Sequence, residues 1–196
     1  LGPLRPLGYK TKGLLYGFIL ALTALAMFHV GHQQVCRRNS RVVLVLGGLI
    51  GHLLIVRLVM VLADAGSIEE TYRYLFVPCA LAPMLHGVLL GRSVGSFSAV
   101  YVSLIGSLLV PKDDVINYLI ISLVAGMTAV LCTDKVRKRI KLIRAGIYVG
   151  IVMVILALAF GKLDAMGVFG PGSMGHLQIL GTGSGIAFAT ALATAM

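Results

Sequence analysis

The sequence predicts an all-α membrane protein, a polytopic bundle of about seven transmembrane helices. Hydrophobic residues make up 58% of its 196 positions and Gly adds 24 more, whereas charged residues make up only 12%, about half the usual share. The mean hydropathy is +0.97. No soluble fold can hide that much apolar surface, so this composition excludes a soluble enzyme, a disordered tail and a disulfide scaffold.

The long apolar runs of the chain are its predicted spans. A helix needs about 20 residues, at 1.5 Å each, to cross the hydrocarbon core, and about 17 are enough in some cases. Each run must be helical, because lipid cannot satisfy open backbone groups. Only Gly91, Arg92 and Ser93 separate the third run from the fourth, which predicts a tight helical hairpin. The qualifying runs are residues 13–31, 42–63, 74–91, 93–110, 115–132, 145–161 and 179–196.

The distribution of charge over the loops predicts the orientation. Residues 32–41, Arg92 and residues 133–144 together carry ten bases and one acid, whereas the opposite ends of the spans carry six bases and six acids. Lys and Arg accumulate in cytoplasmic loops. The sequence therefore predicts an N-terminus outside the cell and, after seven spans, a C-terminus in the cytoplasm.

Gly and Pro residues mark expected packing features of the spans. Pro78 and Pro83 interrupt the third run, where each removes a backbone donor, so a kink or local unwinding is expected. Gly residues four apart share a helix face and let two backbones approach closely. This spacing is open to two interpretations, a dimer face or packing within the chain. The pairs are Gly13/Gly17, Gly47/Gly51, Gly91/Gly95, Gly146/Gly150 and Gly181/Gly185.

Ionisable residues within spans are candidate sites, because burying them in lipid is costly. His52 lies at the middle of the second run, Arg57 lies five residues nearer its outer end, and His86 lies toward the inner end of the third run. One hypothesis is a ligand pocket formed by these three residues; the alternative is neutral histidines bonded to neighbouring helices. Interhelical hydrogen-bond donors are expected at Ser103, Ser107, Asn117 and Ser122.

The sequence shows no pattern that predicts catalysis within these residues. We find no GxSxG, Walker A or HExxH motif and no paired carboxylates within a span, so we assign no catalytic residue and no metal ligand here. A basic segment orients the chain and is suited to anionic headgroups; nucleic acid is not expected to be a partner. Its bases are Lys135, Arg137, Lys138, Arg139, Lys141 and Arg144.

Three stretches together resemble a known family. They are YLFVPCALAPMLHGVLLGRSVGSFSAVYVSLIGSLL (74–109), ISLVAGMTAVLC (121–132) and VRKRIKLIRAGIYVG (136–150). The proline-containing span, the LLG turn into a small-residue span and the basic loop running into RAGIYVG are similar to the membrane part of bacterial seven-transmembrane receptors with an intracellular HD hydrolase domain. The resemblance covers residues 74 to about 160 through these motifs, and the flanking residues only through their hydropathy.

The resemblance implies a role in signalling. It implies a membrane anchor, in the bacterial inner membrane, excised from a longer protein with an extracellular domain and a cytoplasmic HD domain. That domain would be a metal-dependent phosphohydrolase acting on a cyclic dinucleotide such as cyclic di-AMP, with its divalent metal bound outside these residues. The expected partners are the lipid bilayer, the chain's own flanking domains and a second copy of the chain. The alternative hypothesis is a small-solute binding or transport protein.

Overall fold

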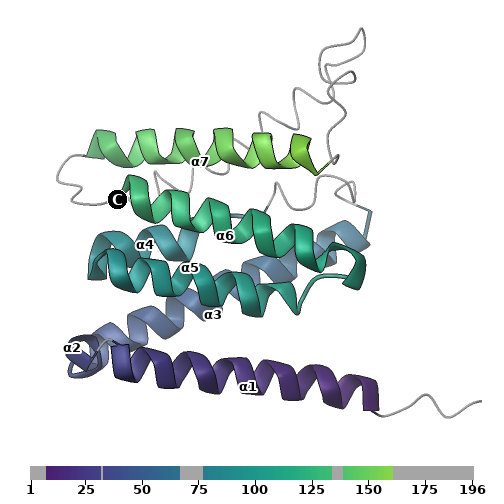
Figure 1. Cartoon of the computed structure of the whole chain (residues 1–196), viewed down its shortest axis with the longest axis horizontal. Helices are drawn as coiled ribbons and strands as arrows, with labels where there is room; N and C mark the ends of the chain where they lie inside the picture. The colour runs from purple at the N-terminus through teal and green to yellow at the C-terminus, as the bar shows by residue number, and fades with distance from the viewer. Residues whose placement is uncertain (1–7, 32, 67–76, 134–138, 161–196) are drawn as a thin grey trace, which may run out of the picture.

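All the regular elements that the computed structural model describes are helices (Figure 1). It describes residues 8–31, 33–66, 77–133 and 139–160. The all-α class predicted from composition is therefore confirmed. The predicted span 179–196 lies outside the described residues. The helices are α1 (Gly8–Gly31), α2 (Gln33–Cys36), α3 (Asn39–Asp64), α4 (Leu81–Leu90), α5 (Arg92–Ser107), the 3-10 turn η2 (Lys112–Asp114), α6 (Val115–Cys132) and α7 (Arg139–Ala159).

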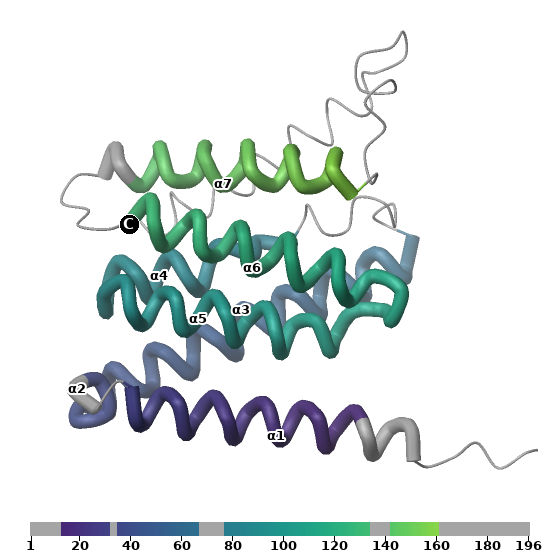
Figure 2. Tube along the Cα trace, viewed as in Figure 1, coloured from purple at the N-terminus to yellow at the C-terminus, as the bar shows by residue number. Residues whose placement is uncertain are grey.

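Helices α4, α5 and α6 pack against one another, and α7 packs along α6 (Figures 1 and 2). Helix α3 crosses behind α4 and α5, and α1 lies along the far side of α5. An aromatic contact joins α1 to α5: the ring centroids of Phe28 on α1 and Phe97 on α5 are 5.2 Å apart. The short helix α2 forms the corner between α1 and α3. The core thus centres on α4, α5 and α6, with the other helices around it.

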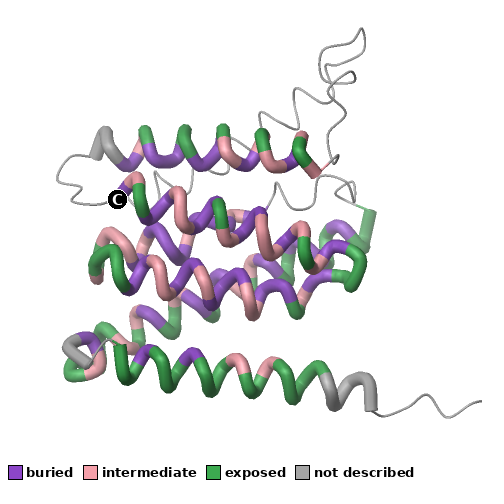
Figure 3. Tube along the Cα trace, viewed as in Figure 1, coloured by how far each residue is buried: buried purple, intermediate pink, exposed green. Residues whose placement is uncertain are grey.

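Four of the described helices are long and apolar enough to cross a membrane. Their outward faces carry large apolar side chains, and α1 is the least buried of the four (Figure 3). Lipid is as apolar as a protein core, so such faces are stable in a bilayer. Helix α4 is apolar but shorter. The four spans are Gly13–Gly31, Asn39–Asp64, Lys112–Cys132 and Leu142–Ala159.

The hairpin predicted between the third and fourth runs is confirmed. Helix α4 ends at Leu90, and Gly91 adopts φ +101°, a backbone conformation that side chains rarely allow. Helix α5 begins at the next residue, Arg92. Gly is therefore required at this turn because of its conformation, whereas a Cβ there would meet no atom within 4 Å.

The prolines of the third run start a helix rather than kink one. Pro78 lies before α4 and accepts a hydrogen bond from the Leu81 amide at 2.9 Å. Pro83 lies in the first turn of α4, where its missing N–H would have no helical partner anyway. Of the predicted span 74–91, the described residues 77–80 are not helical and α4 covers Leu81–Leu90.

Glycines allow α4, α5 and α6 to approach at backbone distance. A Cβ built on Gly95 would lie 2.8 Å from the Cα of Gly87, which is closer than real Cβ contacts. A Cβ on Gly126 would lie 3.1 Å from the Cβ of Ala99. By contrast, Gly47 would meet no atom within 4 Å. The interpretation of packing within the chain is thus confirmed for Gly95, whereas Gly47 on α3 makes no such contact with the described residues.

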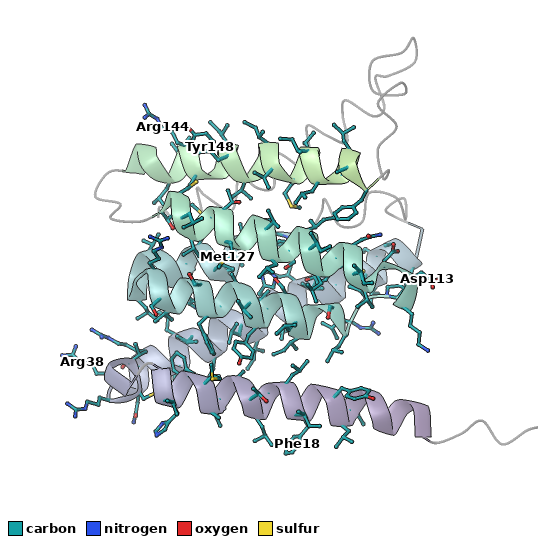
Figure 4. All side chains as sticks on the ribbon, in the orientation of Figure 1. Phe18, Arg38, Asp113, Met127, Arg144 and Tyr148 are labelled. Atoms are coloured by element: carbon teal, nitrogen blue, oxygen red, sulfur yellow. The ribbon has the colours of Figure 1, made fainter. Side chains whose placement is uncertain are left out.

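Charged side chains lie at both ends of the bundle. Arg38 and Arg144 lie at one end and Asp113 at the other (Figure 4). The described carboxylates, Asp64, Asp113 and Asp114, all belong to the end that holds the C-terminus of α3 and the start of α6. The structure therefore places Arg38 and Arg144, which the sequence assigned to one side of the membrane, at the same end of the bundle.

Candidate functional site

The two histidines predicted at membrane depth are both fully buried. His52, on α3, and His86, on α4, are each 0% exposed. Helix α3 packs against α4 and α5, and its buried face includes His52, Leu49 and Val56. Two imidazoles thus lie in the interface between α3 and the α4–α5 hairpin, as the hypothesis of a shared site requires.

His86 is held by neighbours on both sides. Its Nδ1 lies 2.9 Å from the Ser98 hydroxyl on α5, and its Nε2 lies 3.4 Å from the carbonyl oxygen of Leu44 on α3. A carbonyl only accepts, so Nε2 carries the proton and donates to Leu44, while Nδ1 accepts from Ser98. His86 therefore links three helices, and its bond to α3 is the longer one.

Gly48 makes room for this imidazole. A Cβ at that position would collide with the ring, lying 2.9 Å from Cε1 of His86. His52 follows Gly48 by four residues and so lies one turn further along the same face of α3. The notch at Gly48 and the imidazole of His52 are therefore adjacent features of one interface.

Among the described residues, neither ring nitrogen of His52 has a hydrogen-bond partner. A neutral imidazole carries one donor and one acceptor, and leaving such groups buried without partners costs about 1–3 kcal/mol. Apolar side chains flank His52 on α3. Leu49 belongs to one buried apolar cluster and Val56 to the other. The burial of the His52 imidazole in this apolar interface therefore lowers the stability of the fold.

Arg57 does not join the two histidines. It is exposed, whereas His52 is fully buried, because the two residues lie about 140° apart around α3. The hypothetical pocket of three residues is therefore reduced to a pair. Among the described residues no group of three or more metal-ligating side chains is present.

A second polar contact links α5 and α6. The hydroxyls of Ser103 and Ser122 lie 3.0 Å apart, and Ser103 also lies 2.7 Å from the carbonyl oxygen of Ala99. Since Ser103 donates its one proton to that carbonyl, Ser122 donates to Ser103. The expectation of interhelical bonding is confirmed for these two serines, whereas Ser107 donates to Leu104 within its own helix, at 2.7 Å.

The basic segment enters the structure at the start of α7. Helix α7 begins at Arg139, six residues before the predicted span, and Arg144 is exposed at the basic end of the bundle. Lys135, Arg137 and Lys138 lie outside the described residues. The segment from Arg139 onward thus extends a spanning helix.

Two residues of the site escaped sequence reasoning. Ser98 and Gly48 both contact His86, but each lies on a different helix from it. One sequence signal could have indicated this contact. Gly48 lies four positions before His52 on the same face of α3, and a residue without a side chain leaves space there for a group from another helix. The partnership itself depends on how the helices cross.

Comparison with known proteins identifies the family. The model of the family described as 7TM receptor with intracellular HD hydrolase matches residues 9–196. The chain belongs to this family. No curated protein and no solved structure gives a significant match.

The match confirms the resemblance seen in residues 74–160 and extends it over nearly the whole chain. The family's description names a seven-transmembrane receptor together with an intracellular HD hydrolase. The described bundle therefore corresponds to the seven-transmembrane receptor region of this family, and the chain is a multi-pass membrane protein.

Proposed function

We propose that this chain anchors, and transmits signals to, a metal-dependent HD-type phosphohydrolase that hydrolyses a cyclic dinucleotide such as cyclic di-AMP. The family match carries this proposal, because the family joins a seven-transmembrane receptor to an intracellular HD hydrolase. The catalytic domain and its divalent metal would lie outside these residues, in the bacterial cytoplasm, and the bundle would lie in the inner membrane.

The proposed orientation rests on charge. The exposed Arg38 and Arg144 lie at one end of the bundle and Asp113 at the other. Arginine-rich loops remain on the cytoplasmic side of bacterial membranes. The Arg38 end would therefore face the cytoplasm, toward the hydrolase, and the Asp113 end would face outward.

Transmission of a signal requires two packings of the bundle that differ in energy by only a few kcal/mol. The contact of α3 with α4 and α5 is the best candidate for the moving part. A backbone contact at Gly95 holds α4 against α5, and Gly126 of α6 lies close to the side chains of Ala99 and Pro83. The polar bond from α3, by contrast, is the 3.4 Å contact of His86. His52, without a partner in this packing, would gain one in the other, either from a ligand or from His86.

The activity can be tested on the longer protein in which this chain occurs, purified in detergent with Mn²⁺. Hydrolysis of cyclic di-AMP to a linear product would support the proposal, and intact cyclic di-AMP, together with no turnover of other cyclic dinucleotides, would refute it. A His52→Leu variant tests transmission, with Leu54→Ala on the exposed face of α3 as the matched control. We expect His52→Leu to change the basal rate and the control to leave it unchanged; equal rates would refute a role for His52.

A further inference from the structure

The corner between α1 and α3 carries a dense group of cations. Arg37, Arg38 and Arg41 lie within five consecutive residues, and all three are exposed. No described carboxylate lies at this end of the bundle, because the described acids belong to the opposite end. The three guanidinium groups, here called the arginine corner, therefore form a cationic surface without a counter-charge among the described residues.

The arginine corner is well anchored to the bundle. Val35, just before it, is 7% exposed and packs in the cluster that contains Phe28 and Leu49. The amide of Arg41 donates to the carbonyl oxygen of Arg38 at 2.9 Å. Because the backbone is fixed in this way, the three side chains start from positions held close together, which lowers the entropy lost on binding a shared ligand.

The corner lies at the depth of lipid headgroups. The stretch of α1 that is long and apolar enough to cross a membrane ends at Gly31, and the next such helix, α3, begins at Asn39. Arg37 and Arg38 fall between these two ends, at the boundary of the hydrocarbon layer. At that depth the abundant anion is the phosphodiester of the surrounding phospholipids.

Guanidinium is well matched to this anion. It presents a planar fork of donors that bonds two phosphate oxygens at once, and it is more weakly hydrated than an ammonium group. Arg144 adds a further exposed guanidinium at the same end, on α7. We propose that the arginine corner binds the headgroup of an anionic phospholipid of the membrane leaflet on this side, with Arg37, Arg38 and Arg41 on its phosphate.

The test is lipid binding by the purified chain in detergent, followed by native mass spectrometry. The probes are dioleoylphosphatidylglycerol and dioleoylphosphatidylcholine. A base near a membrane surface contributes about 1 kcal/mol of attraction, so each Arg→Gln change should weaken phosphatidylglycerol binding about fivefold. The triple variant Arg37→Gln, Arg38→Gln, Arg41→Gln should weaken it about 100-fold and bind both lipids alike.

A matched control separates the corner from charge in general. Arg57→Gln also removes one exposed arginine, but from the half of α3 that leads to Asp64, away from the corner, and it should leave the preference for phosphatidylglycerol unchanged. Circular dichroism checks that the triple variant is folded, and Arg38→Gln alone serves if it is not. Equal effects of Arg38→Gln and Arg57→Gln would overturn the proposal.

Two other outcomes would also overturn it. Displacement of phosphatidylglycerol by millimolar inorganic phosphate would mean that the corner is a site for free phosphate. Unchanged lipid binding by the folded triple variant would mean that the corner serves a protein partner, such as a cytoplasmic domain, or orients the chain only.

Discussion

Replacing Gly95 with Ala tests the packing of α4 against α5 most directly. The added Cβ would lie 2.8 Å from the Cα of Gly87 and 3.0 Å from the carbonyl oxygen of Pro83. Non-bonded carbons prefer about 3.5–4.0 Å, so the two helices must separate by roughly 0.7 Å or more. Both neighbours are backbone atoms, which cannot rotate away as a flexible side chain would.

The energetic effect can be isolated with a control. Overpacking of this kind costs about 1–3 kcal/mol, whereas Gly→Ala within a helix gains up to about 1 kcal/mol from helix propensity. Gly47→Ala receives the same gain but meets no atom within 4 Å. The difference between the two variants therefore removes the propensity contribution and leaves about 1–3 kcal/mol of packing cost.

Thermal unfolding in detergent micelles, followed by circular dichroism, measures this difference. One kcal/mol corresponds to about 2–4 °C for a domain of this size, so Gly95→Ala should melt about 2–12 °C below Gly47→Ala. Gly126→Ala should fall between them, because its closest contact would be 3.1 Å. Equal melting temperatures for Gly95→Ala and Gly47→Ala would refute the backbone-level contact between α4 and α5.

Three further predictions concern the polar interfaces and the orientation. His52→Leu should leave thermal stability unchanged or raise it, since it removes an unpartnered polar group, whereas His86→Leu should lower stability by about 1–3 kcal/mol; the reverse order would contradict the assignment of contacts. A double-mutant cycle on Ser103→Ala and Ser122→Ala should give a coupling of about 0.6 kcal/mol, and a value of zero would exclude their hydrogen bond. In intact cells a membrane-impermeant maleimide should fail to label Cys36 from outside, and labelling would invert the proposed topology.

The residues at membrane depth show how far sequence reasoning reaches. The positions of His52 and His86 along their spans could be read from the sequence, and so could the angle that separates His52 from Arg57. That His86 meets Gly48 and Ser98 could not, since those residues lie on α3 and α5. Similarly, Gly47 and Gly95 share the same spacing pattern, yet only Gly95 lies at a backbone contact.

The sequence by itself determined the all-α class of the protein, its apolar runs and the uneven distribution of bases over its loops. These properties depend on composition and on the local length of a helix, which lipid enforces on any chain of this kind. Tertiary structure alone decided that α4 begins after Pro78, and that His52 is buried without a hydrogen-bond partner in the part of the chain that the structure describes. The physical reason is that lipid and protein interior are equally apolar, so hydropathy cannot show which face of a spanning helix meets another helix and which meets the membrane.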